Sequence, residues 1–257
     1  MSHPGPVAAP PQMSASPRRG GAHERLLEVY ERLLAHYGPQ HWWPGDSPFE
    51  IIVGAILTQS AAWTNVEKAI ASLKTAGLLS PAALRETPHA ELARRIRPSG
   101  YYNAKATKLQ AFATYLHDHY NDDLDALLSR DPAMLREELL GIFGIGKETS
   151  DSIVLYAAGS PSFVIDAYTR RIGRRLGFGV ASERYEEWQR FIEDRLPRDR
   201  RVFNEYHALL VRLGKEACRK EPFCDRCCLQ GICPTGRRNA IAIRPVRRRR
   251  ERDSVKP

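Results

Sequence analysis

Five cysteines lie within one short segment near the C-terminal end, and the rest of the chain has none. In a reducing compartment such a cluster holds metal far more often than disulfides. Four thiolates at x5, x2 and x5 spacing suit either zinc or a 4Fe–4S cluster: Cys218, Cys224, Cys227 and Cys233. The fifth, Cys228, adjoins Cys227, and consecutive residues seldom serve one centre equally well. We therefore interpret Cys228 as the spare.

A second candidate site is a turn that contains two glycines. Residues 139–149 predict two helices joined by this turn, in which Gly144 and Gly146 allow positive φ and close approach of the backbone to another molecule. The N–H groups that begin the second helix form an anion site, and Lys147 adds positive charge. We assign Gly144, Gly146, Lys147 and Thr149 to a phosphate-binding set. The alternative is an ordinary helix corner in which the glycines serve only the bend.

A third candidate is a single carboxylate. Asp166 ends the apolar segment Ser162–Ile165 and begins the helical segment AYTRRIGRRLG. An aspartate at this place is most simply a helix N-cap, which contributes about 1 kcal/mol. The residue type alone does not separate this structural role from a catalytic one.

The elements that must position these residues are helical almost throughout. Apolar residues recur at helical spacing, and prolines and capping residues mark several helix starts. Ser162–Ile165 has β-rich composition but is only four residues long. The sequence therefore predicts an all-α fold. The segments expected to be helical are 24–37, the run from Pro48, 65–75, 82–86, 90–96, 102–119, 129–140, 150–157, the run after Asp166, and 202–215.

Composition and charge narrow the class of protein. The chain has 257 residues, 42% of them hydrophobic, and a formal net charge of +9, which favours a polyanionic partner. No apolar run approaches the roughly 20 residues needed to cross a bilayer. Residues 1–22 lack the apolar stretch of a secretory signal and predict a disordered extension. Residues 237–257, with the run Arg247–Arg250, predict a basic disordered tail. We expect a cytoplasmic or nucleoid-associated protein.

Several of these motifs together resemble one enzyme superfamily. The string GIFGIGKETSDSIVLYAAGSPSFVIDAYTRRIGRRLG resembles the helix-hairpin-helix and catalytic segment of the endonuclease III superfamily. The similarity extends to PFEIIVGAILTQS, to Tyr102–Ala106 and to the cysteine cluster, over roughly residues 48 to 233. It implies a monomeric DNA base-excision-repair glycosylase whose partner is double-stranded DNA containing damaged bases.

The resemblance also implies an architecture. Two helical subdomains would flank a DNA-binding cleft. Residues 39–158 would form a six-helix barrel that includes the helix-hairpin-helix. Residues 23–38 together with 159–234 would form a second subdomain with the catalytic aspartate and an iron–sulfur loop, which favours a 4Fe–4S cluster over zinc.

The resemblance assigns roles to single residues as well. Asp166 matches the catalytic carboxylate, which would work ionised and stabilise positive charge on the deoxyribose during hydrolysis. Gln59 and Ser60 match residues that fill the gap left by a flipped nucleotide. An equally fair interpretation is that Gln59 holds backbone together inside the protein.

Glu148 and the pair Trp42-Trp43 bear on the reaction type and on the substrate. Strand-nicking members carry a Schiff-base lysine where this chain has Glu148, which predicts weak or absent lyase activity. Trp42 and Trp43 resemble the base pocket of the 3-methyladenine DNA glycosylase III branch, and their faces would favour cationic alkylated purines. Alternatively, one or both tryptophans pack in the core.

Two other functions stay open. One is an endonuclease III-type glycosylase that acts on oxidised pyrimidines with weak or no lyase activity. The other is a non-catalytic protein that binds damaged DNA through the same hairpin.

Overall fold

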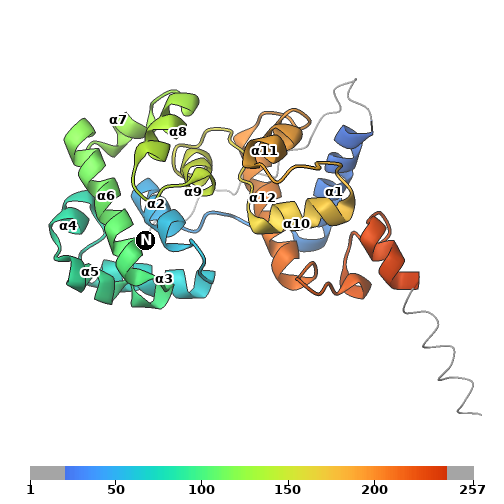
Figure 1. Cartoon of the computed structure of the whole chain (residues 1–257), viewed down its shortest axis with the longest axis horizontal. Coiled ribbons are helices and arrows are strands. Elements are labelled where there is room, and N and C mark those ends of the chain that lie inside the picture. The colour runs from blue at the N-terminus through green and yellow to red at the C-terminus, as the bar shows by residue number, and fades with distance from the viewer. Residues whose placement is uncertain (1–20, 242–257) are drawn as a thin grey trace, which may run out of the picture. The chain divides into compact units, whose positions relative to one another are not determined.

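The computed structural model describes residues 21–241 and divides the chain into two compact units (Figure 1). The central unit consists of residues 43–164. The terminal unit combines the residues up to Trp42 with those from Ile165 onward. Every regular element in residues 21–241 is a helix, which confirms the all-α prediction. These unit boundaries lie a few residues beyond the 39 and 158 expected from the sequence.

The central unit is a packed set of helices around one buried helix, α2. Its elements are α2 (Pro48–Leu57), α3 (Trp63–Thr75), α4 (Pro81–Glu86), α5 (His89–Arg95), the 3₁₀ turn η1 (Arg97–Ser99), α6 (Tyr102–Tyr120), α7 (Leu124–Leu128), α8 (Pro132–Gly141), α9 (Lys147–Ser152) and the π-helical turn η2 (Ile153–Ala157). Pro48 occupies the first turn of α2, and the Ser47 hydroxyl accepts the Glu50 N–H at 3.2 Å. Because α2 is apolar on nearly all sides, α3, α6 and η2 pack around it.

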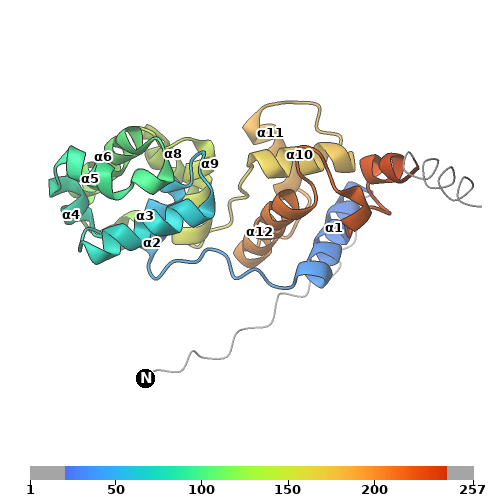
Figure 2. The same ribbon diagram turned by 90° about the horizontal axis from the view of Figure 1, so that it is seen from below.

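The terminal unit is organised around the long helix α12. Its elements are α1 (Ala22–Tyr37), α10 (Ala167–Leu176), α11 (Tyr185–Glu193), α12 (Arg200–Glu216) and the 3₁₀ turn η3 (Cys224–Arg226). Figure 2 shows α1 beside α12, and α10 also packs on α12. The Tyr206 hydroxyl donates to the Leu26 carbonyl at 2.9 Å, and the ring meets Tyr30 edge-on. This core joins the N-terminal helix to the segment that follows Ile165.

Residues 234–241 also form a helix, so the prediction of an unstructured tail from residue 237 is wrong for residues 237–241. Two features account for the difference. Pro234 stands at the first helical position, where proline is favoured. Asn239 donates from Nδ2 to the Cys224 sulfur at 3.2 Å, which fastens the helix to the cysteine loop.

The remaining terminal predictions lie largely outside the described residues. These are the extension at residues 1–20 and the tail from residue 242, including Arg247–Arg250. Ala22, which the sequence placed in the extension, begins α1. Among residues 21–241 no helix is both long and apolar enough to cross a bilayer.

Candidate functional site

The two hairpin glycines differ in what the fold requires of them. Gly144 has a φ of +83°, and a Cβ built there would lie 2.2 Å from Cγ of Lys108. Both the backbone conformation and the packing therefore demand glycine at this position. Gly146 has a φ of −94° and is the N-cap residue of α9; a Cβ there would meet no atom within 4 Å. Within residues 21–241, no packing contact demands glycine at this position.

The side-chain amide of Gln59 forms hydrogen bonds with the hairpin. Its Nε2 donates to the Gly144 carbonyl at 3.0 Å and to Oγ1 of Thr149 at 2.9 Å, and its Oε1 accepts from Nζ of Lys108. These contacts support the interpretation in which Gln59 holds backbone together. The next residue, Ser60, is exposed and has a φ of +53°, which is uncommon for a residue other than glycine.

The first turn of α9 separates exposed from buried side chains. Lys147 and Glu148 are exposed, whereas Thr149 is buried with its hydroxyl on Gln59. Thr149 thus positions the hairpin from inside. Phe143 is 66% exposed just before Gly144, so an apolar ring projects beside the glycines.

Sequence reasoning missed two lysines of α6, one of which packs against the hairpin. Lys108 contacts both Gly144 and Gln59. Lys105 is buried and donates to the carbonyls of Leu57 and Ser99 at 2.8 and 2.6 Å, and burial lowers its pKa to about 8. Both lie on α6, in the segment KATK, where two lysines three residues apart share one helix face. That spacing was the available signal.

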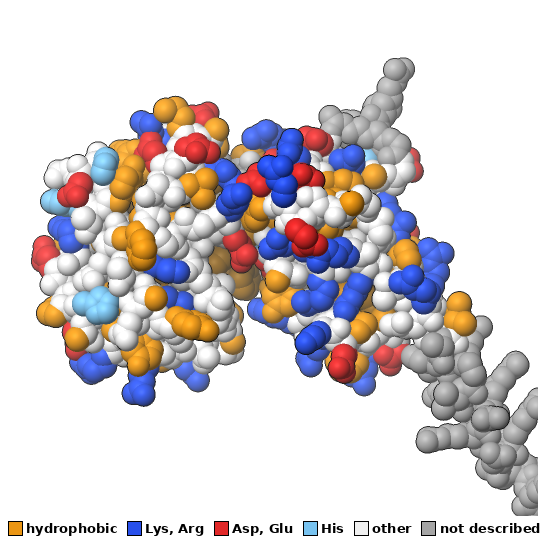
Figure 3. Space-filling view, viewed as in Figure 1, with side chains coloured by type: hydrophobic (Ala, Val, Ile, Leu, Met, Phe, Trp, Pro, Cys, Tyr) orange, Lys and Arg blue, Asp and Glu red, His pale blue; other side chains and the backbone are white. Residues whose placement is uncertain are grey.

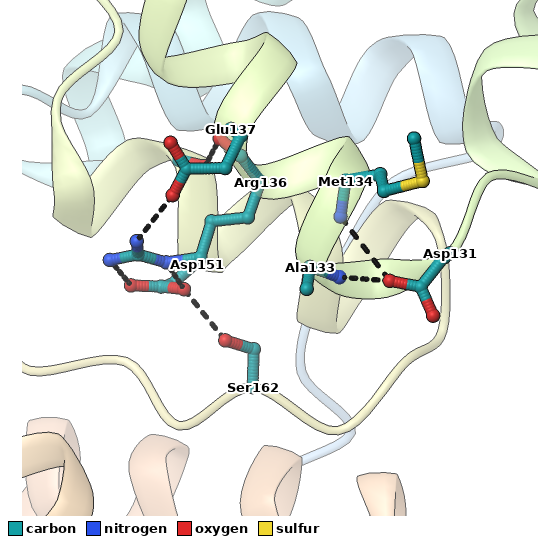
Figure 4. Close-up of polar contacts among 8 residues, drawn as sticks. Asp131, Ala133, Met134, Arg136, Glu137, Asp151 and Ser162 are labelled. Atoms are coloured by element: carbon teal, nitrogen blue, oxygen red, sulfur yellow. Dashed lines mark hydrogen bonds and ion pairs between the residues drawn. The ribbon is translucent and has the colours of Figure 1, made fainter.

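A buried ion pair supports the hairpin on its other side (Figure 4). Arg136 of α8 donates to both carboxylate oxygens of Asp151 of α9, at 2.8 and 3.2 Å. Ser162 adds a third bond to Asp151 at 2.6 Å. Since Asp151 is wholly buried, these bonds fix α8, α9 and the segment before Ile165 to one another.

Asp166 is the N-cap of α10. Its Oδ1 accepts the Thr169 N–H at 2.7 Å, as its position in the sequence predicts, and the residue is 8% exposed. The preceding N–H, of Ile165, donates to the Tyr185 hydroxyl at 3.1 Å. The carboxylate is therefore held by the first turn of α10, and the backbone that precedes it is held by Tyr185.

The second oxygen of Asp166 faces a histidine that sequence reasoning missed. Oδ2 lies 3.8 Å from Nε2 of His207 on α12. His207 is 6% exposed. Burial lowers its pKa, against the opposing effect of the Asp166 charge. The available signal was a titratable residue at a buried position of an otherwise apolar helix face.

The two adjacent tryptophans fall in different units. Trp43 packs within the central unit, 5.3 Å from both the Trp63 and Tyr156 rings, and a Cβ on Gly54 would lie 3.0 Å from its indole nitrogen. Core packing thus accounts for this residue. Trp42 belongs to the terminal unit, where Nζ of Lys215 lies 5.7 Å from its ring centre.

Basic side chains gather over α10 on one face of the terminal unit (Figure 3). Much of this charge has partners inside the unit. Arg171 donates to the carbonyls of Gly214 and Cys218, and Arg175 to the carbonyls of Arg219 and Lys220. These two arginines tie α10 to the cysteine loop.

The four cysteines expected to bind metal line one small cavity of about 20 Å³, and Cys228 does not line it. Two of the sulfurs accept N–H hydrogen bonds: Cys218 from Arg175 at 3.3 Å and Cys224 from Asn239 at 3.2 Å. Such donors stabilise thiolates. No group of three or more His, Cys, Asp or Glu side chains in the described ranges is arranged to hold a metal ion. The donor set fits a thiolate-bound centre in chemistry, while the side-chain geometry does not by itself form one.

Comparison with known proteins places this geometry in a family. Residues 53–198 match the model of the HhH-GPD superfamily base excision DNA repair protein. The chain is 43% identical over 211 residues to MJ1434 of Methanocaldococcus jannaschii, which carries the name of a DNA repair glycosylase; the match covers 82% of this chain and 96% of that protein. It is 28% identical to endonuclease III of Thermotoga maritima, covering 88% of this chain and all of the relative.

A solved structure gives the same result. The H. pylori 3-methyladenine DNA glycosylase MagIII, bound to 1,N6-ethenoadenine, superposes with a TM-score of 0.66 and 26% identity, over 76% of this chain and 97% of that one. These matches confirm the endonuclease III resemblance. The chain belongs to the HhH-GPD superfamily of base excision DNA repair glycosylases.

Proposed function

We propose that this protein is a monofunctional DNA glycosylase that hydrolyses the N-glycosidic bond of alkylated purines in double-stranded DNA. The observation that carries the monofunctional assignment is Glu148, two residues after Gly146 at the exposed start of α9. A carboxylate there cannot form the imine that strand nicking requires. The likeness to MJ1434 and to MagIII supports the glycosylase class and the alkylated purine, respectively.

The hairpin binds the DNA backbone in this proposal. Gly146 leaves open space where a side chain would stand, so a phosphate can approach the N–H groups that begin α9. Lys147 supplies positive charge beside them. Lys108 and Gln59 hold the turn in shape from within.

Asp166 carries the chemistry. An alkylated purine bears positive charge, so it leaves as a neutral base and takes the bonding electrons with it. The deoxyribose then becomes an oxocarbenium-like cation, which an ionised Asp166 stabilises. A water attacks the anomeric carbon, and its proton passes to the carboxylate and then to solvent. Trp42 would stack on the cationic base through cation–π attraction. In the structure a cation already lies over this ring, because Nζ of Lys215 is 5.7 Å from the ring centre.

We further propose that Cys218, Cys224, Cys227 and Cys233 hold a 4Fe–4S cluster, with zinc as the alternative. The shared cavity and the N–H donors to two sulfurs support this donor set. When bound, the group cross-links the loop after α12. Arg171 and Arg175 connect that loop to α10, which begins at Asp166, so the role we assign to the centre is structural.

The test uses duplexes that contain either a 3-methylpurine or thymine glycol. Each reaction is analysed on a denaturing gel before and after alkali. Breaks in the alkylated duplex only after alkali would support the proposal. Breaks in the thymine glycol duplex without alkali would refute both the substrate and the argument from Glu148.

The second candidate is an oxidised-pyrimidine glycosylase, favoured by the match to T. maritima endonuclease III over 88% of the chain. Alkali-dependent breaks at thymine glycol would select it. A non-catalytic binder is separated from both by Asp166→Asn. An enzyme loses turnover and keeps DNA affinity, whereas a binder has no turnover to lose.

A further inference from the structure

Two oxygens of one carboxylate have different partners in the terminal unit. Oδ1 of Asp166 is committed to the N–H of Thr169 at 2.7 Å and caps α10. Oδ2 points toward α12, with Nε2 of His207 at 3.8 Å. The cap bond orients Oδ1, whereas Oδ2 faces Nε2 of His207 across a gap longer than a hydrogen bond. A hydrogen bond to Oδ2 would hold the carboxylate at its second oxygen as well.

His207 is well suited to be that partner because α12 holds it rigidly. The neighbours Tyr206 and Ala208 are buried, the Tyr206 hydroxyl is bonded to Leu26, and α10 packs on α12. His207 itself is 6% exposed. A side chain placed by a packed helix is held more precisely than one on a loop.

We propose that His207 is a positioning residue that directs Oδ2 of Asp166, with its proton on Nε2. The inference rests on the catalytic role of Asp166 under the proposed function. The present separation of 3.8 Å is longer than a hydrogen bond, and the contact shortens when damaged DNA occupies the site, as catalytic hydrogen bonds commonly do.

The protonation state of the imidazole decides what it contributes. Burial lowers the pKa of His207, which favours the neutral ring at neutral pH. A neutral N–H orients the carboxylate without offsetting its negative charge. An imidazolium would compete with the deoxyribose cation for that charge. His207 therefore fixes direction and preserves the field on which Asp166 acts.

The test compares His207→Leu, which removes the donor, with His207→Gln, which keeps an amide N–H near the same reach. Tyr206→Phe is the matched control, since it removes a buried hydroxyl from the adjacent position of the same helix. Single-turnover excision is measured in the full chain on methylated duplex DNA, or on the thymine glycol duplex if that is the one processed. Affinity is measured with a duplex carrying a tetrahydrofuran abasic analogue, and folding by thermal unfolding.

We expect His207→Leu to slow excision by about tenfold to a hundredfold with unchanged affinity, as a misplaced catalytic group does. His207→Gln should stay within about threefold of the parent rate and Tyr206→Phe should match it, because both retain a donor or leave Asp166 untouched. Normal excision by His207→Leu, or equal loss in His207→Gln, would overturn the inference. So would a loss of DNA affinity that accounts for the slower excision.

Asp166→Asn separates this inference from the proposed function. If Asp166→Asn is inactive while His207→Leu is normal, only the positioning role fails. If Asp166→Asn excises at the parent rate, or the parent chain processes neither duplex, the proposed function itself fails and the inference with it.

Discussion

The two hairpin glycines differ in what the fold requires of them. Gly144 is required by its φ of +83° and by Lys108, whereas no contact among the described residues requires glycine at Gly146. The sequence presents both as G-x-G and predicts the turn, but it does not distinguish them. The distinction depends on a lysine 36 residues earlier on α6, which no local pattern reveals.

The first prediction separates the two glycines by substitution with alanine. Gly146→Ala should lower the free energy of unfolding by no more than about 1 kcal/mol, because alanine is a poorer N-cap than glycine while the φ is ordinary and the surroundings are open. It should weaken DNA binding by about tenfold, which corresponds to about 1.4 kcal/mol, because the methyl group stands where a phosphate approaches. Urea unfolding and a DNA titration measure the two effects.

Gly144→Ala is the control and should behave in the opposite way. It should destabilise the fold by about 1–3 kcal/mol through backbone strain and the clash with Lys108. Unchanged DNA affinity in Gly146→Ala would contradict the assignment of this turn to the DNA backbone.

The second prediction concerns His207 and pH. Its folded pKa lies below the unfolded value of about 6.5, so the unfolded chain binds the extra proton as the pH falls. The stability that the neutral buried ring provides is complete above that value and is lost as the pH drops toward the folded pKa. Between pH of about 7.5 and about 5.5, the parent chain should therefore lose more unfolding free energy than His207→Gln. Urea unfolding at the two pH values measures this; parallel losses would refute it.

The start of a helix could be predicted from the sequence where a proline or a capping residue marks it. Pro48 marks the start of α2, and Asp131 followed by Pro132 marks α8, which begins three residues after the predicted Ser129. The π-helical turn η2 and the helix over residues 234–241 were not predictable. The π-helical turn η2 directly follows α9, and its residues are packed in the core. The helix over residues 234–241 is held by the hydrogen bond from Asn239 to the Cys224 sulfur. Both are tertiary effects, which local propensity does not contain.

The third prediction tests the ion pair that joins α8 to α9. Asp151→Ala should destabilise the fold by about 3–5 kcal/mol, because it leaves the Arg136 guanidinium, 19% exposed, without its buried carboxylate. The double variant Arg136→Met with Asp151→Leu should recover much of that loss, since a well-packed apolar pair can replace a buried ion pair. Urea unfolding of the single and double variants decides the matter. A double variant as unstable as the single one would show that the carboxylate acts through Ser162 instead.

The whole molecule was predictable in outline from the order of its motifs. The buried helix, the hairpin and Asp166 follow one another in the order that the resemblance implies, and the family match over residues 53–198 spans the hairpin and Asp166. The cysteine loop lies beyond that match. The surroundings of single residues could not be predicted in the same way. Gln59 and Thr149 support the hairpin from inside, and Trp43 packs on α2. Gln59 and Thr149 contact residues remote in sequence, and Trp43 packs on Gly54 of α2 and on the Trp63 and Tyr156 rings, so the residue type did not reveal the surroundings.

The fourth prediction concerns the metal centre. Cys218→Ser should abolish the brown visible absorbance of an iron–sulfur protein, whereas Cys228→Ser should retain it, because Cys228 does not line the shared cavity. Loss of the centre should also lower Tm, since the loop carries contacts to α10 through Arg171 and Arg175. A colourless parent chain that contains zinc would select the alternative metal. Loss of colour in Cys228→Ser would refute the ligand assignment.

The charge of the molecule provides the fifth prediction. Residues 242–257 contain seven Lys or Arg and two Asp or Glu, which is +5 of the net +9. Sequence-independent attraction to DNA scales with the phosphates that such charges neutralise, and each neutralised phosphate contributes a slope of about −0.9 in log affinity against log salt. Removing residues 242–257 should therefore weaken DNA binding at low salt and flatten its salt dependence. The identity of the excised base should not change, because Trp42, Asp166 and the hairpin are retained. Binding titrations at several salt concentrations, with excision assayed in parallel, measure both effects, and an unchanged salt slope would exclude the tail from DNA contact.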